Sequence, residues 1–139
     1  MRVERYSEDE AEEQLLKLEY RLAQIEQVES CQRDYLSFVR TMWPEFIAGR
    51  HHKIMAEKLE RVASGDLKRL IINMPPRHTK SEFASYLFPA WMIGKNPAMK
   101  IIQATHTTEL AVNFGRKIKN LLERDEYLEI FPDAALSAD

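Results

Sequence analysis

The chain of 139 residues contains one cysteine and four glycines, and it lacks any long hydrophobic run. Because Cys31 is alone, no disulfide can form within the chain, and the first residues do not have the apolar stretch of a signal peptide. Its apolar runs are short, such as residues 70–72, whereas a membrane span needs roughly 18 residues. We therefore expect a soluble protein in a reducing, cytoplasmic setting.

The charge is distributed unevenly along the sequence. Residues 1–29 carry nine acidic and four basic side chains, which gives this leader a net charge of −5 and the rest of the chain +3. There is no internal repeat and no low-complexity stretch. With 45% hydrophobic residues, the length suits one globular core and is too short for two ordinary domains.

An amphipathic helix is predicted in the acidic leader and is expected to end near Glu29. Its apolar side chains fall at alternating spacings of three and four residues: Leu15, Leu18, Leu22 and Ile25. We expect this stripe to pack on the chain's own core. The alternative is a short coiled-coil seam, for which the pattern of fewer than two heptads is weak support.

Four further helices are predicted from apolar periodicity and from the residues that begin and end helices. They cover residues 35–43, 52–64, 80–93 and 107–121. The second of them is expected to stop at Gly65, because glycine readily adopts the left-handed backbone of a helix end. The third contains Pro89, which removes one amide and collides with the preceding turn, so a kink is expected there.

Two short apolar segments, residues 67–73 and 99–105, are predicted to be buried parallel strands. The adjacent Leu70, Ile71 and Ile72 suit a strand that is covered on both faces. From residue 67 onward, predicted strands alternate with predicted helices, which is the order of a right-handed βαβ unit. The sequence therefore predicts an α/β fold with parallel strands, preceded by a helical N-terminal leader.

The junction between the first predicted strand and the next helix carries the strongest functional signal. The first amides of a helix are unpaired and the helix dipole favours an anion there. Lys80 would reach the β and γ phosphates of a nucleotide, and the Ser81 hydroxyl would ligate a bridging magnesium ion. The predicted cofactors are therefore ATP and Mg²⁺.

The junction departs from the usual Gly-x-x-x-x-Gly-Lys-Ser/Thr pattern, since Met74 and Thr79 occupy the two glycine positions. Pro75 and Pro76 lack amide hydrogens, so a phosphate cradle must come from the amides of residues 77–81. Thr79 is β-branched, so either the loop avoids a positive φ there or strain is stored. An ordinary strand-to-helix loop with a surface lysine is the alternative.

The segment Asn-Met-Pro-Pro-Arg-His-Thr-Lys-Ser-Glu at residues 73–82 resembles the variant Walker A motif of terminase large subunits, the motors that package DNA into the heads of tailed bacteriophages. The resemblance extends over about residues 35–131. It includes three further segments in the same order: Gly-Arg-His-His at 49–52, Gly-Asp-Leu-Lys-Arg-Leu-Ile-Ile at 65–72, and Gln-Ala-Thr-His-Thr-Thr-Glu-Leu-Ala at 103–111. It implies a partial P-loop NTPase of the RecA/helicase-like type.

The resemblance also implies roles for single residues. Six neighbouring residues would hold ATP: Pro76, Arg77, His78, Thr79, Lys80 and Ser81. Arg77 would be the catalytic group, a charge sensor or cis arginine finger for the transferred phosphoryl oxygens, or alternatively a solvent-facing arginine. His52 stands where related proteins often have a glutamine that reads adenine, or it is a structural histidine.

Two other regions have a functional and a structural interpretation. Residues 105–108 follow the second predicted strand, where open α/β sheets place ligands, but they could equally cap the next helix. Arg116, Lys117 and Lys119 suit a nucleic-acid backbone, although three such charges also fit a solvated helix face.

Two features of the terminase family are not found in the sequence. Hydrolysis requires a hydrophobic strand that ends in Asp-Glu, and nothing after Ser81 has that form. The carboxylate cluster of the nuclease domain is absent as well. We therefore expect an N-terminal part of a terminase, with a helical leader at residues 1–48 and an incomplete P-loop ATPase domain at residues 49–139, which does not turn over ATP by itself.

The resemblance implies the host bacterial cytoplasm as the location and no membrane contact. The implied partners are double-stranded DNA, the remaining part of the terminase, the small terminase subunit and the portal protein. Two alternative functions stay open: a non-enzymatic fragment that binds motor or portal components through its helical leader, and another helicase-like P-loop ATPase.

Overall fold

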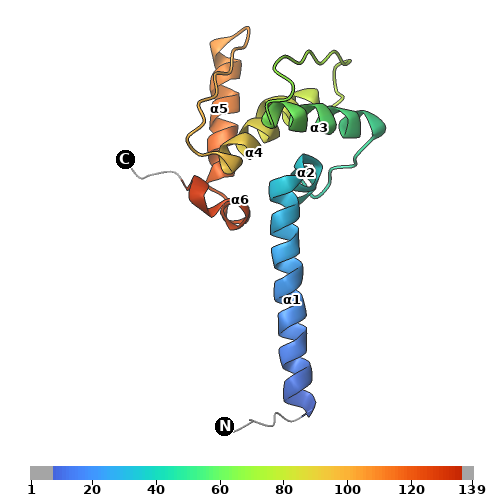
Figure 1. Ribbon diagram of the computed structural model, residues 1–139. Coiled ribbons are helices and arrows are strands. Elements are labelled where there is room, and N and C mark those ends of the chain that lie inside the picture. Colours follow the sequence, from blue (N-terminus) through green and yellow to red (C-terminus); the bar gives the residue numbers. More distant parts are fainter. Residues whose placement is uncertain (1–7, 136–139) are drawn as a thin grey trace.

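The computed structural model describes residues 8–135, in which helices alternate with extended segments and no strand is present (Figure 1). The helical elements are α1 (Glu8–Arg33), α2 (Tyr35–Met42), α3 (Arg50–Ala63), η1 (Glu82–Leu87), α4 (Phe88–Lys95), α5 (Thr108–Leu122), α6 (Asp125–Ile130) and η2 (Pro132–Ala134). The described part is therefore all-α. The predicted α/β fold, a partial P-loop NTPase with parallel strands, is wrong.

Both predicted strands are extended but unpaired. Residues 67–73 run above α3 and residues 99–105 run beside α5 in Figure 1, so neither segment meets the backbone of the other. Leu70 and Ile72 are half-buried against the core, whereas Ile71 is 89% exposed, so the first segment has one wet face. A sheet needs a neighbouring strand to receive its backbone hydrogen bonds, and residues 8–135 do not supply one.

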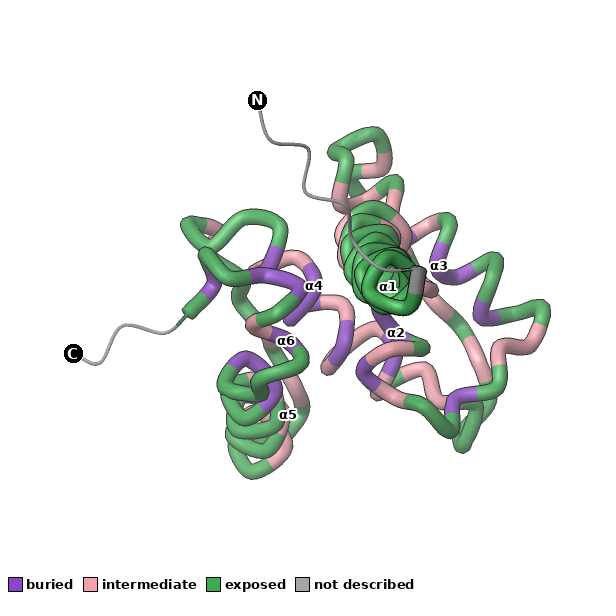
Figure 2. The backbone as a smooth tube through the Cα atoms, turned by 90° about the horizontal axis from the view of Figure 1, so that it is seen from below, coloured by how far each residue is buried: buried purple, intermediate pink, exposed green. Residues whose placement is uncertain are grey.

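The core is a cluster of aromatic side chains from α2, η1, α4 and α6. Its five largest members are at most 1% exposed: Tyr35, Phe38, Phe83, Trp91 and Tyr127. The ring of Tyr35 meets that of Phe83 edge-on at 4.9 Å between centroids, and Phe38 meets Tyr127 edge-on at 6.2 Å, the arrangement that aromatic quadrupoles favour. Figure 2 shows the buried backbone gathered where α2, α4 and α6 approach one another.

Buried tyrosine hydroxyls tie the core helices together. The Tyr35 hydroxyl donates to the carbonyl of Phe83, and the Tyr127 hydroxyl donates to the carbonyl of Ala90 at 2.8 Å. Burial raises the pKa of both tyrosines well above the ordinary value, so both remain neutral donors. Among the described residues no buried side-chain nitrogen or oxygen lacks a partner, which is what a stable core requires.

The helical run from Lys80 to Lys95 contains one widened turn, η1, which ends two residues before Pro89. Proline has no amide to offer to the carbonyl of Ser85, four residues earlier. That carbonyl instead accepts a hydrogen bond from Gln103 Nε2 at 3.0 Å. The expected disturbance at Pro89 therefore takes the form of a π-helical turn, and a side chain from the second extended segment compensates for the missing bond.

The predicted ends of the other helices agree with the structure to within two residues for α2, α3 and α5. Gly65 ends α3 with φ 84°, and the amide of Leu67 returns to the carbonyl of Arg61 at 2.9 Å. Thr107 begins α5, since its hydroxyl accepts from the amide of Leu110 at 3.2 Å. These predictions of helix ends are confirmed. They depend only on the sequence near each helix end, because a capping residue forms its hydrogen bonds with backbone groups a few positions away.

Helix α1 projects away from the other helices, and its C-terminal end packs against α2 and α6 (Figure 1). Four apolar side chains of its outer part are 55–58% exposed: Leu15, Leu18, Leu22 and Ile25. The prediction that this stripe packs on the chain's own core is wrong, because these four residues lie on the part of α1 that projects beyond the core. None of the helices in residues 8–135 combines the length and the apolar character of a membrane span.

Candidate functional site

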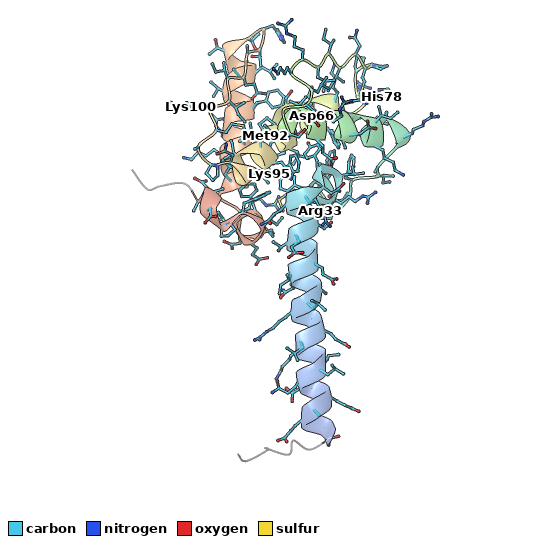
Figure 3. All side chains as sticks on the ribbon, viewed as in Figure 1. Arg33, Asp66, His78, Met92, Lys95 and Lys100 are labelled. Carbon is cyan, nitrogen blue, oxygen red and sulfur yellow. The ribbon has the colours of Figure 1, made fainter. Side chains whose placement is uncertain are left out.

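The turn at residues 75–79 joins the first extended segment to the helix that starts at Lys80. Five residues of the turn and helix start are exposed: Pro75, Pro76, Arg77, His78 and Ser81. Thr79 and Lys80 are half-buried. His78 lies at the outer edge of the molecule in Figure 3, so the turn is open to a ligand from solvent.

The backbone of the turn is left-handed at two residues, Arg77 with φ 64° and Thr79 with φ 55°. No other non-glycine residue among those described has a positive φ. A side chain in this region costs of order 1–2 kcal/mol, and for a β-branched residue such as Thr79 the conformation is an outlier. Of the two possibilities raised by the sequence, the structure shows stored strain. Left-handed residues beside right-handed ones make a concave row of amides, the arrangement that binds anions in phosphate loops.

The amides of the turn are available for such binding. Within residues 8–135, none of the amides from Arg77 to Ser81 donates a hydrogen bond to the protein. The first committed amide after the turn belongs to Phe83, which donates to the carbonyl of Thr79 at 2.9 Å. The free amides thus sit at the positive end of the helical run 80–95, where the dipole adds to their attraction for an anion.

His52 connects the turn to the start of α3. Its side chain is 5% exposed, its Nδ1 accepts from the amide of Gly49 at 3.0 Å, and its Nε2 lies 2.6 Å from Thr79 Oγ1. Because Nδ1 accepts, the proton of the neutral ring is assigned to Nε2, which donates to the Thr79 hydroxyl. That hydroxyl donates in turn to the carbonyl of His78 at 2.7 Å. Both ring nitrogens of His52 are therefore engaged inside the protein.

Two further histidines lie close enough to His52 to affect its pKa. The Nε2 atoms of His51 and His52 are 3.1 Å apart, and the rings of His51 and His78 lie 6.0 Å apart between centroids. Burial lowers the pKa of His52, and the possible positive charges of His51 and His78 lower this pKa further. Among the described residues no three His, Cys, Asp or Glu side chains come together in a way that could hold a metal ion.

The core fixes the other side of the turn. Phe83, whose amide binds the Thr79 carbonyl, is completely buried beneath Tyr35. The ring of Phe83 also lies 5.5 Å from that of His52. Thr79 is thus bound through its carbonyl to η1 and through its hydroxyl to α3, and these two contacts hold its strained backbone in place.

The stretch at residues 105–108 has the geometry of a helix cap. Besides the Thr107 cap of α5, the Thr105 hydroxyl donates to the carbonyl of Thr107 at 2.6 Å. These threonine hydroxyls are therefore engaged locally. This agrees with the capping interpretation of the segment.

Two of the three basic side chains on α5 are ion-paired. Lys117 Nζ lies 2.8 Å from Glu82, the residue that follows Ser81, and Lys119 Nζ lies 3.7 Å from Glu123. The pair of Lys117 and Glu82 joins α5 to the first turn of the helix behind the candidate site. Because both pairs are at the surface, each contributes little to stability.

The structure brings His52 against Thr79 from 27 positions away, while the other predicted binding residues are neighbours along the chain. Sequence reasoning missed this hydrogen bond and the anchoring of the turn through Phe83. The available signal was Thr79 itself, because a β-branched residue in a left-handed position persists only where its surroundings hold it there.

The arrangement can bind an anion through exposed amides, assisted by the ammonium group of Lys80 and the hydroxyl of Ser81. Its strained backbone is fixed by contacts to α3 and η1. In comparisons with known proteins, no family model, no curated protein and no solved structure matches this chain.

Proposed function

We propose that residues 75–81 bind the phosphates of ATP with a magnesium ion, and that the chain is the nucleotide-binding N-terminal part of a terminase large subunit. One observation carries the proposal: a strained, exposed turn with two left-handed residues and uncommitted amides leads directly into a helix that starts with Lys80 and Ser81. The resemblance of residues 73–82 to the variant Walker A motif of that family supports the same assignment.

Each residue of the turn has a chemical role in this proposal. The amides of residues 77–81 surround the phosphate oxygens, and Lys80 neutralises the β and γ phosphates. Ser81 contacts the magnesium ion that bridges them. Arg77 is exposed beside these amides, where its guanidinium can stabilise the negative charge on the oxygens of the transferred phosphoryl group. Pro76 and His78 contribute backbone and no required side-chain chemistry.

We assign to His52 a positioning role. Its ring nitrogens are both engaged inside the protein, one by Gly49 and the other by Thr79, so neither is directed to a base. The hydrogen bond to Thr79 supports a backbone conformation that costs energy. A turn held in its binding conformation before the ligand arrives loses less entropy on binding, so His52 increases affinity without contacting ATP.

The proposal does not depend on a sheet, because the anion is bound by the turn and the helix behind it. The family's activity, ATP-driven packaging of double-stranded DNA, needs an acidic motif to activate water, so turnover belongs to the complete motor. DNA, the small terminase subunit and the portal protein are partners of that motor in the host cytoplasm.

The direct test is a calorimetric titration of the protein with ATP and magnesium. Replacing Lys80 with alanine should weaken binding by about tenfold or more, because one charge-assisted contact to phosphate is lost. Lys100→Ala removes the same charge from the second extended segment and should leave affinity unchanged. Equal affinities for the two variants and the wild type would refute the assignment.

The role of Arg77 requires variants that separate its charge from its backbone. Arg77→Gly removes the guanidinium but keeps the left-handed conformation without strain, whereas Arg77→Ala removes the guanidinium and retains the strain. We expect Arg77→Gly to bind ATP as the wild type does and to lower turnover in the completed motor. Normal turnover with this variant would remove Arg77 from the mechanism.

A further inference from the structure

We infer that the outer part of α1 is a dimerisation surface, along which a second copy of this chain lies parallel to the first in a two-stranded coiled coil. The surface consists of one row of apolar side chains, here called the α1 stripe: Ala11, Leu15, Leu18, Leu22 and Ile25. Its four large members are more than half exposed. Such a contiguous row of large aliphatic side chains is typical of an interaction surface and uncommon on a surface that stays in water.

The spacing of the α1 stripe is that of a coiled-coil seam. Its large residues follow one another at intervals of three, four and three, which places Leu15 and Leu22 at a positions and Leu18 and Ile25 at d positions. Ala11 occupies the preceding d position. The 26 residues of α1 make a rod of about 39 Å. Figure 1 shows the outer part of this rod free of neighbouring helices, so a second helix has room beside it.

A second copy fits this seam because a parallel pair is self-complementary. Around a two-fold axis, each a and d side chain of one helix packs against the same positions of the other. No described segment of the chain covers Leu15, Leu18 or Leu22, and Ile25 lies at the edge of a hollow that it lines together with Glu126, Glu129 and Ile130 of α6. The partner's seam presents the same aliphatic side chains at the same intervals.

Charges beside the seam also match in a parallel pair. Arg21 occupies a g position and Glu26 the e position five residues later, so Arg21 of each copy faces Glu26 of the other. Neither residue forms an ion pair within the described part of the chain. Two such interchain pairs flank the layer formed by Leu22.

An antiparallel pair would place like charges together. The e positions hold Glu12, Glu19 and Glu26. In the antiparallel arrangement e positions face e positions, so Glu19 would oppose its own copy and Glu12 would oppose Glu26. Repulsion between these carboxylates disfavours that orientation and leaves the parallel one.

Helix α1 provides its own control on the opposite face. Leu16 and Tyr20 are exposed as well, but they occupy b and f positions, which point away from a two-stranded seam. Replacing these two residues with glutamate introduces the same charges on the same helix as replacing two residues of the α1 stripe. The two pairs of substitutions differ only in whether the side chains point into the seam.

The first experiment measures the mass of the full chain by sedimentation equilibrium between roughly 1 and 500 μM, the range for a seam of about two heptads. The wild type should form dimers as the concentration rises, and Leu18→Glu/Leu22→Glu should remain monomeric. Leu16→Glu/Tyr20→Glu should dimerise as the wild type does. All three proteins should show the same circular dichroism at low concentration, because the substituted positions are exposed.

The second experiment tests orientation. Arg21→Glu and Glu26→Arg should each weaken self-association by about tenfold or more, because like charges then face each other twice in the parallel dimer. An equimolar mixture of the two variants should restore it, because every facing pair is again opposite in sign. Ala11→Cys should form a disulfide between copies on mild oxidation, since only a parallel pair brings residue 11 beside residue 11.

Several results would overturn the proposal. A monomeric wild type throughout the range would remove the dimer and leave the stripe for another partner. A mass of three or four chains would contradict the two-stranded form. Equal behaviour of the two double variants would show that association does not use the α1 stripe. Failure of the mixture to restore association, or of Ala11→Cys to cross-link, would exclude the parallel arrangement.

Discussion

The aromatic core and the outer part of α1 begin from the same kind of sequence pattern and end in opposite environments. Tyr35 and Phe38 of α2 are fully buried, whereas Leu18 and Leu22 of α1 are more than half exposed. Both sets lie on one face of a helix. Aromatic rings from η1, α4 and α6 pack against the rings of α2, whereas no described helix covers Leu15, Leu18 or Leu22 of α1. Periodicity therefore predicts a helix and its apolar face, but the rest of the chain decides whether that face is covered.

The strongest test of this contrast is a pair of truncations measured by chemical denaturation at low protein concentration. Phe38→Ala should lower the free energy of unfolding by about 3–5 kcal/mol, since it leaves a cavity among the rings of Tyr35, Tyr127 and Phe131. Leu22→Ala should change it by less than about 0.5 kcal/mol, because this side chain is already in water when α1 is unpaired. A large loss with Leu22→Ala would mean that the α1 stripe is covered within one chain.

Alanine substitutions at two glycines should change the stability by smaller amounts and in opposite directions. A methyl group added at Gly94 of α4 meets the ring of Phe131, so Gly94→Ala should destabilise the fold by about 1–3 kcal/mol through overpacking. Gly115 of α5 has open space at the same position. Gly115→Ala should therefore raise stability by about 0.5–1 kcal/mol, since alanine restricts the unfolded chain and favours the helix. Melting temperatures that move in the same direction for both variants would contradict this account of the packing.

The fold was predictable where local chemistry decides it and not where distant segments must meet. The ends of α3 and α5 follow from Gly65 and Thr107, which act on their own neighbours. The two predicted strands failed because strand pairing is a property of two segments. The run of Leu70 to Ile72 contains no information about which backbone lies beside it.

The candidate site divides in the same way. The uncommitted amides before Lys80 could be expected from the turn and the helix start, which are local features. The hydrogen bond between His52 and Thr79 could not, because it depends on how α3 packs against η1. The π-helical turn before Pro89 is intermediate: proline predicts a lost hydrogen bond, but the sequence does not indicate that Gln103 replaces it.

The smallest predicted effect is a pH dependence of stability that comes from His52, the residue that connects the core to the exposed turn. Its pKa is lowered by burial and by His51 and His78, so in acid the unfolded chain binds a proton more readily than the folded one. Stability from the neutral ring is therefore complete above the ordinary histidine pKa of about 6.5 and is lost as the pH falls through the lower folded value. Protonation also turns Nδ1 into a donor, which breaks its bond from the Gly49 amide.

We therefore expect the melting temperature to fall between pH 7.5 and pH 5, and we expect His52→Gln to reduce that fall, because glutamine does not titrate. His106→Gln changes an exposed histidine two residues before α5 and should keep the wild-type pH dependence. If His52→Gln retained the full dependence, protonation of His52 would not be its source. The same experiment followed by ATP titration separates two functions of the ring: a stability effect without an affinity effect would place His52 in the core alone, whereas loss of both would show that the core positions the turn.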